Sequence, residues 1–531
     1  MINTTRTIII GTRGSKLALW QANHVKDRLE AIGVPCEIKI IKTQGDIVLH
    51  LRLDKLEGKG FFTKELEEEL LRGDIDLAVH SHKDMPTQHP EGLIIAAGSE
   101  RENPAELLII RKESAEPTQR YSLKKDALVG TSSNRRKAQL LSFRPDLSFA
   151  DLRGNVITRV DKLRQGQYDA ILLAKAGMKR IEMDLSEFDV VEIPPNELVP
   201  APAQGVLALQ TRETDEELIQ ILQSIHNKDT AEEIAVERHV LQLFEAGCHA
   251  PLGCYCRRSD EGFEVWTAKA DLADEFPDRY FVKASTTEGL AEQIAKHYTQ
   301  QTKAPKGVFI SRELAADSFF ARALTKHQVD VVGQSLIKVK GIPDSLSSVN
   351  FAQVDWVFFT SKNSVIHFFE QQPALRSDVR FAVIGRGSEE QLRKLGKVPA
   401  FSGESFGIDM EGVGKAFAEI AAGQRVLIPR ALDTLGTMKA AMENKVTVVD
   451  VAIYQSEQVS NVEARKDEVF VFTSPSNVRA YFESNSLAPN QKVISIGHST
   501  GKALSSLEIP FVLPATPDEI GLAEAVFGLF E

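Results

Sequence analysis

The sequence predicts an α/β protein of several domains, and three observations support this. Short β-branched runs alternate with amphipathic helical patterns, the chain has 531 residues, and one strand-and-turn pattern occurs twice near its end. Alternating strands and helices are typical of parallel α/β architecture. At roughly 100 to 200 residues per domain, the length indicates about three to five domains.

The first strand–helix–strand unit is predicted over residues 7–42. A strand over 7–11 is followed by a helix whose apolar face carries Ala18, Ala22, Val25 and Leu29, at spacings of three and four. Gly33 stands where such a helix would end, and a strand over 37–42 resumes the sheet.

Further units follow the same pattern. A helix over 62–72 stops at Gly73 and leads into a strand over 76–80. One helix begins after residues 131–133, and another over 155–164 stops at Gly166 and precedes a strand over 169–174.

Two boundaries divide the chain. Residues 194–202 are dense in proline, which excludes regular helix and marks a crossing between domains. The polar stretch 299–307 precedes a new strand over 308–310, where a second major part begins.

The second part repeats itself. Residues 357–365 resemble 471–478, and residues 382–388 resemble 494–500 at almost the same separation along the chain. Two matching pairs at one separation indicate a duplicated α/β unit, so we expect two similar lobes.

Composition excludes several classes of protein. The hydrophobic and charged fractions, 43% and 26%, are ordinary for globular proteins, and no apolar run approaches the roughly 18 residues of a membrane helix. We expect no signal peptide, because residues 7–10 are too short an apolar core. Only four cysteines occur, which favours a reducing compartment, so we expect a cytoplasmic protein.

The charge is uneven along the chain. A net charge of -11 argues against nucleic-acid or acidic-membrane partners. Between Thr131 and Gln165, however, cations outnumber acidic residues, which predicts an anion site.

Asp84 is the first candidate catalytic residue. It lies in the run 80–86, directly after a predicted buried strand, and ligands bind at such strand ends in open α/β sheets. Its carboxylate could stabilise a cationic intermediate or move protons, or could simply pair with Lys83. A metal site formed with His80 and His82 is the weaker interpretation.

Arginines at predicted helix starts form the candidate anion site. Arg135 and Arg136 follow the capping residues 131–133, and Arg153 and Arg159 flank a second helix start. Cations at the positive end of a helix dipole are unfavourable unless an anion binds there, so carboxylate or phosphate is the expected ligand. Solvated surface charge is the alternative for each arginine taken alone.

The cysteine-rich stretch 245–256 leaves its function open. The spacing of Cys248, Cys254 and Cys256 fits no common zinc pattern, so we expect no metal. Buried structural thiols are the default for Cys254 and Cys256. Cys248 could be a nucleophile or a covalent attachment point.

These motifs together resemble one enzyme family. The resemblance rests on the ordered segments 10–22, 43–46, 58–62, 80–86, 130–136, 152–155, 202–205 and 247–248. In this order they are similar to the signatures of porphobilinogen deaminase, also called hydroxymethylbilane synthase, over roughly the first 300 residues.

The resemblance implies three deaminase domains, the first two resembling periplasmic binding proteins. We expect them at 1–97 plus 199–222, at 98–198, and at 223–303. It also implies a dipyrromethane cofactor bound through a thioether to Cys248. The family joins four porphobilinogen units head to tail, releases ammonia, and frees the linear tetrapyrrole by hydrolysis.

The resemblance further implies roles for individual residues. Asp84 matches the aspartate that stabilises positive charge and assists proton transfer at the cofactor and substrate. Lys59 lies in a mobile loop. The positions that match carboxylate binding by cofactor or substrate are Arg13, Ser15, Lys83, Ser133, Arg135, Arg136, Arg153, Arg159 and Arg180. This chain departs from the family at His82, where many relatives carry leucine or methionine.

The C-terminal part resembles a second family, uroporphyrinogen-III synthase. The resemblance rests on segments 359–361, 384–385, 426–430, 451–455, 473–476, 496–500 and 514–517. It implies a two-lobed α/β domain over 307–531, with one lobe at about 340–455 and the other formed by the remainder. Tyr454 matches the tyrosine that assists departure of a hydroxyl. The turns that would hold substrate carboxylates match Ser361, Ser474, Ser499 and Thr500.

The expected protein is therefore a bifunctional, monomeric enzyme of tetrapyrrole biosynthesis. Its partners would be porphobilinogen and hydroxymethylbilane, with no metal, nucleic acid or membrane. One alternative is a deaminase with a noncatalytic C-terminal domain. A solute-binding protein with an appended α/β domain is the other, although it would need neither Cys248 nor Asp84.

Overall fold

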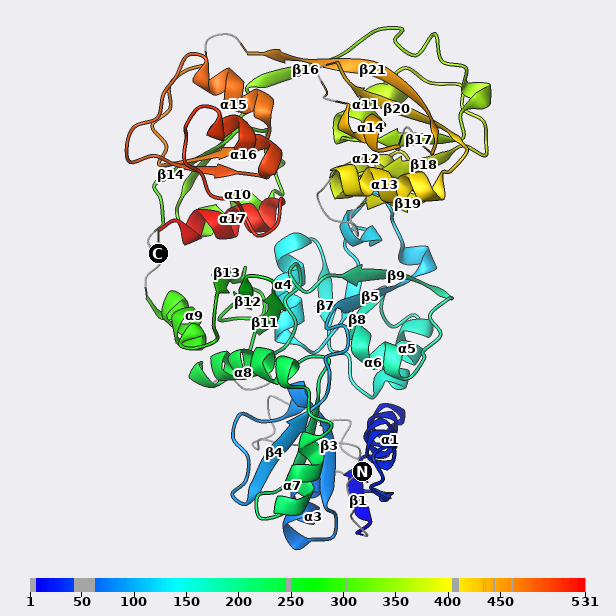
Figure 1. Ribbon diagram of the computed structural model, residues 1–531, viewed down its shortest axis with the longest axis vertical. Helices are drawn as coiled ribbons and strands as arrows, with labels where there is room; N and C mark the ends of the chain where they lie inside the picture. Colours follow the sequence, from blue (N-terminus) through cyan, green and yellow to red (C-terminus); the bar gives the residue numbers. More distant parts are fainter. Residues whose placement is uncertain are drawn as a thin grey trace. The chain divides into compact units, whose positions relative to one another are not determined.

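The computed structural model describes residues 6–42, 63–244, 250–300, 304–403, 410–432, 434, 436–442, 445–459 and 462–530. The chain forms two compact units (Figure 1). Unit 1 comprises Met1–Ala115, Leu123–Ala304 and Glu519–Glu531, and unit 2 comprises Glu116–Ser122 and Pro305–Asp518. Unit 1 is therefore discontinuous in sequence.

Unit 1 begins with a five-stranded sheet of order β2-β1-β3-β10-β4. Its strands are β1 (Ile8–Thr12), β2 (Cys36–Ile40), β3 (Leu77–Ser81), β4 (Leu93–Gly98) and β10 (Leu207–Arg212). Its helices are α1 (Lys16–Glu30), α3 (Lys64–Arg72) and α7 (Glu216–Gln223). Strands β1, β2 and β3 are parallel, whereas β10 is antiparallel to both of its neighbours.

The second sheet of unit 1 has the order β7-β6-β8-β5-β9. Its strands are β5 (Glu106–Arg111), β6 (Leu128–Gly130), β7 (Ser148–Ala150), β8 (Ala170–Ala174) and β9 (Phe188–Ile193). The helices are α4 (Asn134–Phe143), α5 (Val156–Arg164) and α6 (Lys175–Arg180), with a short 3-10 turn at η3 (Lys112–Ser114). The next 3-10 turn, η4 (Arg120–Ser122), belongs to unit 2.

The chain crosses twice between these two sheets, after β4 and before β10. The crossings touch where the Glu102 N–H donates to the Gly205 carbonyl at 3.1 Å. Gly205 has a φ of +90°, and a Cβ there would lie 2.2 Å from the Glu102 carbonyl oxygen. Only glycine permits this close approach.

A third, antiparallel sheet completes unit 1. It consists of β11 (Leu252–Ser259), β12 (Gly262–Lys269) and β13 (Asp278–Ala284). Helices α8 (Lys228–Leu243) and α9 (Leu290–Thr299) cover it, as Figure 1 shows. Residues such as Val240, Val265 and Ile294 form its apolar core.

The last helix, α17 (Glu519–Gly528), packs against β13 within unit 1. Glu524 accepts from Arg279 at 2.9 Å, and both side chains are 4% exposed. Arg279 also donates to the carbonyl oxygens of Asn196 and Glu197. One buried guanidinium therefore joins β13, α17 and the proline-rich crossing.

Unit 2 contains two sheets. One, of order β15-β14-β22-β23, is built from β14 (Gly307–Ile310), β15 (Asp330–Gly333), β22 (Val469–Phe472) and β23 (Lys492–Ser495), with helices α10 (Phe319–Lys326), α15 (Pro475–Phe482) and α16 (His498–Ser505). All neighbouring strands in it are parallel. Its buried Phe309, Phe470 and Tyr481 pack together.

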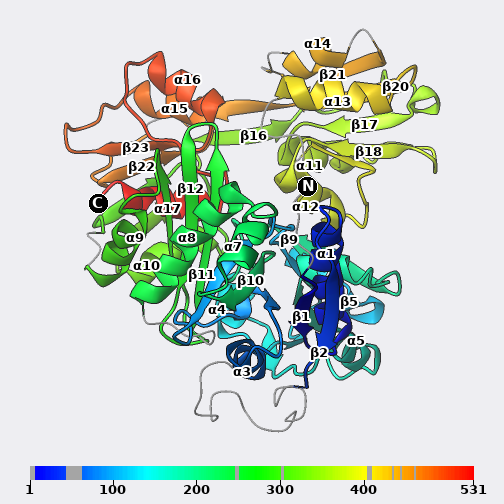
Figure 2. The ribbon, with the colours of Figure 1, turned by 60° about the horizontal axis from the view of Figure 1, so that its bottom comes forward.

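The other sheet of unit 2 has the order β16-β21-β20-β17-β18-β19. Its strands are β16 (Ile337–Gly341), β17 (Trp356–Phe359), β18 (Arg380–Val383), β19 (Phe401–Ser402), β20 (Arg425–Ala431) and β21 (Thr447–Gln458). The helical elements are η5 (Phe351–Gln353), α11 (Lys362–Glu370), α12 (Arg386–Lys394), α13 (Met410–Ile420) and α14 (Thr437–Met442). The long pair β16 and β21 runs between the two lobes in Figures 1 and 2.

The predicted α/β class is confirmed, and most predicted elements occur within a residue or two of their expected ends. The predicted helix start at 62 lies outside the described residues, and the described helix runs from Lys64. The duplicated pattern forms the same device twice, a parallel strand, a Thr-Ser turn and a helix at β17–α11 and at β22–α15.

We predict that Glu524→Gln lowers the free energy of unfolding of unit 1 by about 3 to 5 kcal/mol, because it leaves the buried Arg279 without its carboxylate partner. Denaturant unfolding followed by tryptophan fluorescence measures this. Glu187→Gln, which removes an exposed partner of Arg164, serves as the control and should leave the midpoint unchanged. An unchanged midpoint for Glu524→Gln would show that α17 does not stabilise unit 1.

Candidate active site

The main candidate site is a cavity of about 430 Å³ between the first two sheets of unit 1. Its walls come from the start of α1, the end of β3, the starts of α4 and α5, helix α6 and the second crossing. The predicted residues that line it are Arg13, Ser15, Lys83, Asp84, Arg136, Arg153, Arg159 and Arg180. The fold thus brings together side chains that are far apart in sequence.

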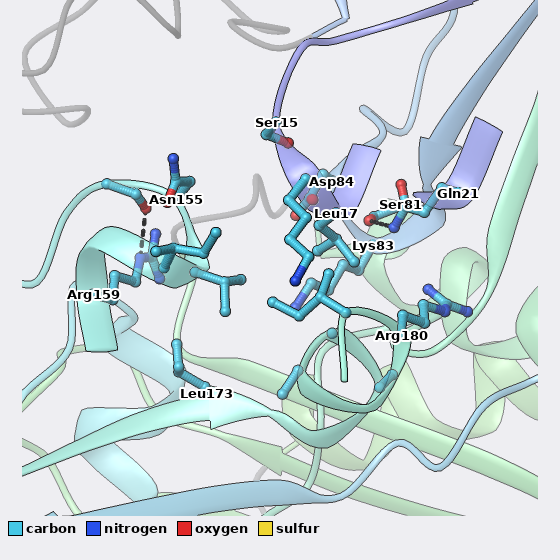
Figure 3. A pocket seen from close by; sticks show the side chains of 18 of the residues that line it. Ser15, Leu17, Gln21, Ser81, Lys83, Asp84, Asn155, Arg159, Leu173 and Arg180 are labelled. Atoms are coloured by element: carbon cyan, nitrogen blue, oxygen red, sulfur yellow. Dashed lines mark hydrogen bonds between the residues drawn. The ribbon is translucent and has the colours of Figure 1, made fainter. Parts of the chain in front are cut away.

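Lys83 and Asp84 reach the cavity because β3 ends there. The strand is buried through His80, and the 3-10 turn η2 (His82–Asp84) follows at its carboxyl end. Gln21 of α1 donates to the Ser81 hydroxyl at 2.8 Å and fixes the end of the strand. Figure 3 shows Lys83 and Asp84 on one side of the cavity, with Arg159 on the other.

Three helices of eight or more residues begin at the cavity wall. Each has a polar residue at its N-cap: Ser15 accepts from the Ala18 N–H, Ser133 from the Arg136 N–H, and Asn155 from the Thr158 N–H. Ser133 was predicted to bind cofactor, and its side chain caps α4. Helix N-termini favour anions, so the backbone and the cations select the same kind of ligand.

The cavity is strongly cationic. Arginine and lysine side chains line it on every wall except the second crossing, and Asp84 is the only acidic residue among the described lining residues. Burial lowers the pKa of Arg159 to about 10 and that of Arg180 to about 10. It lowers the pKa of Lys83 to about 8, although Asp84 raises it. All three are cationic at neutral pH, and a bound carboxylate would relieve the desolvation.

A buried carboxylate that the sequence analysis missed lies behind this wall. Glu106, at the start of β5, is 0% exposed and accepts from Arg135 and Arg136, each at 2.7 Å. Arg135 also donates to the Val199 carbonyl at 2.8 Å, and it does not line the cavity. Its local sequence shows one acidic residue at the start of an apolar run, which does not indicate its partners.

Several further lining residues were not predicted either. They are Lys16, Gln21, Ser132, Asn155 and Gln204. Each lies in a segment on which the resemblance rests, but polar side chains such as Ser132 and Asn155 are equally typical of helix caps and turns. They are recognised as part of the site because the fold brings them together around one cavity.

Two predicted residues, Cys248 and Lys59, lie outside the described residues. Among the residues that are described, no group of three or more His, Cys, Asp or Glu side chains could hold a metal ion. The three described cysteines, Cys36, Cys254 and Cys256, are buried free thiols. In the described part of the chain, no helix combines the length and apolarity needed to cross a bilayer.

Two buried histidines lie beneath the cavity. His80 is hydrogen-bonded to Gln210 at 3.0 Å, and burial lowers its pKa to about 4. His82 is 7% exposed, and its Nδ1 has no hydrogen-bond partner among the described residues. Burial lowers the pKa of His82 to about 3. Both rings are neutral near pH 7.

A second polar cluster lies in unit 2, at the carboxyl ends of its strands. The hydroxyl groups of Tyr454 and Ser361 are 2.9 Å apart. Ser361 caps α11 in a reciprocal capping box with Ser364, and Tyr454 is 7% exposed on β21. The structure therefore brings together two residues predicted from segments almost a hundred positions apart.

The other three predicted residues lie at the carboxyl edge of the four-stranded sheet. Ser474 follows β22 and caps α15, where it accepts from the Asn477 backbone and side-chain amides. Ser499 and Thr500 lie in the first turn of α16, which follows the neighbouring parallel strand β23. Ser499 is exposed, whereas Thr500 is 1% exposed.

Comparison with known proteins identifies both parts of the chain. A family model described as porphobilinogen deaminase, dipyromethane cofactor binding domain, matches residues 8–220, and one described as uroporphyrinogen-III synthase HemD matches residues 318–524. The chain is 40% identical over 296 residues to the porphobilinogen deaminase of Streptococcus sanguinis, covering 55% of this chain and 95% of the relative.

Two further similarities concern one part of the chain each. Identity is 44% over 246 residues to the porphobilinogen deaminase of a Nitratiruptor species, covering 46% of this chain and 77% of the relative. A solved uroporphyrinogen-III synthetase from Helicobacter pylori aligns at 16% identity with a TM-score of 0.33, over 42% of this chain and 98% of that one.

We predict that His82→Met makes the stability of unit 1 less dependent on pH. Between pH 6.5 and about 3 the unfolded chain binds a proton at His82 that the folded chain does not, so stability falls as the pH falls through this window. Replacing the imidazole removes this loss, worth about 2 kcal/mol at pH 5 relative to pH 8.

Denaturant unfolding at pH 5 and pH 8 checks this. His239→Met, at a partly exposed histidine of α8, is the matched control and should leave the difference between the two pH values unchanged. Parallel pH dependences for wild type and His82→Met would contradict the assignment of a buried neutral imidazole.

Proposed function

The chain belongs to the porphobilinogen deaminase family and carries a uroporphyrinogen-III synthase domain after the deaminase part, and on this premise we propose how its residues perform two consecutive reactions. The enzyme is bifunctional, a transferase and a lyase of tetrapyrrole biosynthesis. It joins four porphobilinogen units into hydroxymethylbilane with release of ammonia. It then closes that chain to uroporphyrinogen III, with inversion of the last ring and loss of water.

The observation that carries the first reaction is the cationic cavity around Asp84. Porphobilinogen is a single pyrrole that bears an acetate and a propionate carboxylate. Each unit added to the growing chain therefore adds two carboxylates. Lysine and arginine side chains with helix N-termini behind them are suited to hold such groups, and guanidinium groups bind carboxylates in a bidentate manner. We assign substrate binding to Arg13, Ser15, Lys59, Arg153, Arg159 and Arg180.

Asp84 is assigned the chemical role. Loss of ammonia from the aminomethyl carbon leaves a cationic azafulvene on the incoming pyrrole, and bond formation then releases a proton from the attacked ring carbon. The Asp84 carboxylate, exposed at the cavity, is placed to stabilise that cation and to accept hydrogen bonds from pyrrole N–H groups. Lys83 beside it holds a neighbouring carboxylate.

The residues at the cavity also fit the dipyrromethane cofactor that the matched family domain is named for. Lys83 and Arg136 line the cavity, and the buried Arg136 Nε has no hydrogen-bond partner among the described residues. We assign cofactor binding to Lys83, Asp84, Ser133, Arg135 and Arg136, and covalent attachment, as a thioether, to Cys248. When bound, dipyrromethane supplies the two pyrrole rings on which the chain is extended.

Within this set Arg135 acts indirectly. Its guanidinium donates to Glu106 and to the Val199 carbonyl, so it supports the wall that presents Arg136. Ser133 likewise acts through α4, because its hydroxyl accepts from the Arg136 N–H. These two residues position the site, whereas Lys83 and Arg136 face it.

The synthase reaction is assigned to the cluster in unit 2. The Tyr454 hydroxyl, hydrogen-bonded to Ser361, assists departure of the substrate hydroxyl as water. Backbone N–H groups at the turns carrying Ser361, Ser474, Ser499 and Thr500 hold substrate carboxylates.

The domain boundaries at 1–97 plus 199–222, 98–198, 223–303 and 307–531 are part of the proposal, as is a monomeric enzyme. The last of these ranges includes α17, although that helix packs with unit 1. We propose the cytoplasm as its location, supported by the buried free thiols at Cys36, Cys254 and Cys256, which fit a reducing compartment.

We predict that Asp84→Asn folds but releases ammonia from porphobilinogen about 10² to 10⁴ times more slowly, because the amide cannot stabilise the cation or accept a proton. Steady-state ammonia release measures this. The intact mass of Asp84→Asn should still include dipyrromethane, whereas Cys248→Ser should lack it. Ammonia release near the wild-type rate would remove Asp84 from the mechanism.

We predict that the wild-type chain converts porphobilinogen mainly to type III product and that Tyr454→Phe shifts the product toward type I. Hydroxymethylbilane that is not processed cyclises unaided to type I, so weaker ring inversion changes the isomer ratio while tetrapyrrole formation continues. Oxidation and separation of the porphyrin isomers measure this ratio.

Tyr481→Phe, a buried tyrosine of α15 away from this cluster, is the control and should keep the wild-type ratio. An unchanged ratio in Tyr454→Phe would exclude Tyr454 from the reaction. Type I product alone from the wild-type chain would make the C-terminal part noncatalytic, and absence of porphyrin would refute the whole assignment.

A further inference from the structure

The Glu106 carboxylate is the meeting point of three donors behind the cavity wall. One oxygen accepts from Arg135 at 2.7 Å and from the Gln204 amide at 3.1 Å, and the other accepts from Arg136 at 2.7 Å. Glu106 and Gln204 are both 0% exposed. Strand β5, helix α4 and the second crossing are thereby tied to one side chain.

Two routes lead from this carboxylate to cations of the cavity. The direct route is Arg136, which lines the cavity and whose other terminal nitrogen donates to the Leu172 carbonyl at 3.1 Å. The indirect route passes through Gln204, whose amide oxygen accepts from the Lys83 ammonium at 3.2 Å. Both routes therefore end at residues that line the cavity.

The Glu106 carboxylate also balances the positive charge of the buried arginines around it. Burial alone would raise the pKa of Glu106, but Arg136 and Arg135 outweigh it and hold the value at about 2. The carboxylate is therefore ionised at every working pH. It is a buried negative charge opposite Lys83, Arg135 and Arg136, and Asp84 adds a second one beside Lys83.

We propose that Glu106 is a positioning residue of the deaminase site, holding Arg136 directly and Lys83 through Gln204 in the orientation that receives pyrrole carboxylates. The inference rests on the proposed function and deepens it. Fixing both cations before the ligand arrives reduces the ordering cost of binding, so Glu106 acts on affinity without touching substrate.

A purely structural role for Glu106 would give a different pattern. It would lower stability and the amount of folded protein, but folded molecules would keep their affinity. The positioning role instead predicts a changed KM and a changed pH profile. Without the Glu106 charge, the groups facing Lys83 are Asp84, Arg135 and Arg136, so the lysine loses its proton at lower pH.

The test compares Glu106→Gln with Glu106→Asp in the full chain, with porphobilinogen as substrate. Glu106→Gln keeps the shape and removes the charge, whereas Glu106→Asp keeps the charge. Glu264→Gln is the matched control, because Glu264 is also buried and paired with two cations, Arg257 and Lys283, on the third sheet away from the cavity.

For Glu106→Gln we expect KM to rise by at least about tenfold, with a smaller change in kcat. The alkaline limb of kcat/KM against pH should move to lower pH, and intact mass should show a smaller fraction of chains carrying dipyrromethane. Glu106→Asp should recover most of the KM change, and Glu264→Gln should match the wild type in all three measurements.

The proposal is overturned if folded Glu106→Gln keeps KM, pH profile and dipyrromethane occupancy within about twofold of wild type. If Glu106→Gln does not fold, Gln204→Met decides, because it removes the bridge between Glu106 and Lys83, together with the Gln204 donation to the Pro104 carbonyl, and leaves both arginine pairs intact. An unchanged KM and pH profile in Gln204→Met would then overturn it. Failure of the wild-type chain to consume porphobilinogen would instead refute the proposed function.

Discussion

Unit 1 must accommodate the mutual repulsion of the cations that line one cavity. Arginine and lysine side chains converge there on a space with a single acidic lining residue in the part of the chain described, inside a protein whose net charge is -11. Three devices make this tolerable. Charged groups are held by backbone carbonyls, as Arg159 is by Gly154 and Arg180 by Gly205. Glu106 lies behind the wall, and the proposed substrate carboxylates would complete the balance.

The two reaction sites use opposite strategies for substrates with the same carboxylates. The deaminase cavity concentrates positive side chains, which suits a chain that gains carboxylates at every addition. The proposed synthase site instead consists of hydroxyl groups and helix starts around Tyr454 and Ser361. Backbone donors there would hold a finished tetrapyrrole less strongly than a set of converging cations, which suits a product that must leave.

Local sequence patterns were sufficient to predict the strands, the helices and the polar residues that follow strand ends. Asp84 was found because a polar residue after a strand is visible in the sequence, whereas Tyr454, which lies within β21, was found through the family resemblance alone. Arg135 could not be placed from the sequence, because it stands beside Arg136 at the same helix start and the two are indistinguishable there. The fold shows that its guanidinium binds Glu106 and the Val199 carbonyl. Glu106 itself has partners 29 to 98 positions away, and no local pattern encodes such contacts.

The discontinuity of unit 1 has a consequence for synthesis of the chain. Helix α17 supplies Glu524 to the buried Arg279, yet it follows the whole of unit 2 in sequence. A ribosome therefore delivers β13 long before its covering helix. During that interval Arg279 lacks its carboxylate partner, and the part of β13 that α17 contacts stays uncovered. A message that ends before α17 would therefore yield unit 1 without this helix, even when every residue that lines the cavity has been translated.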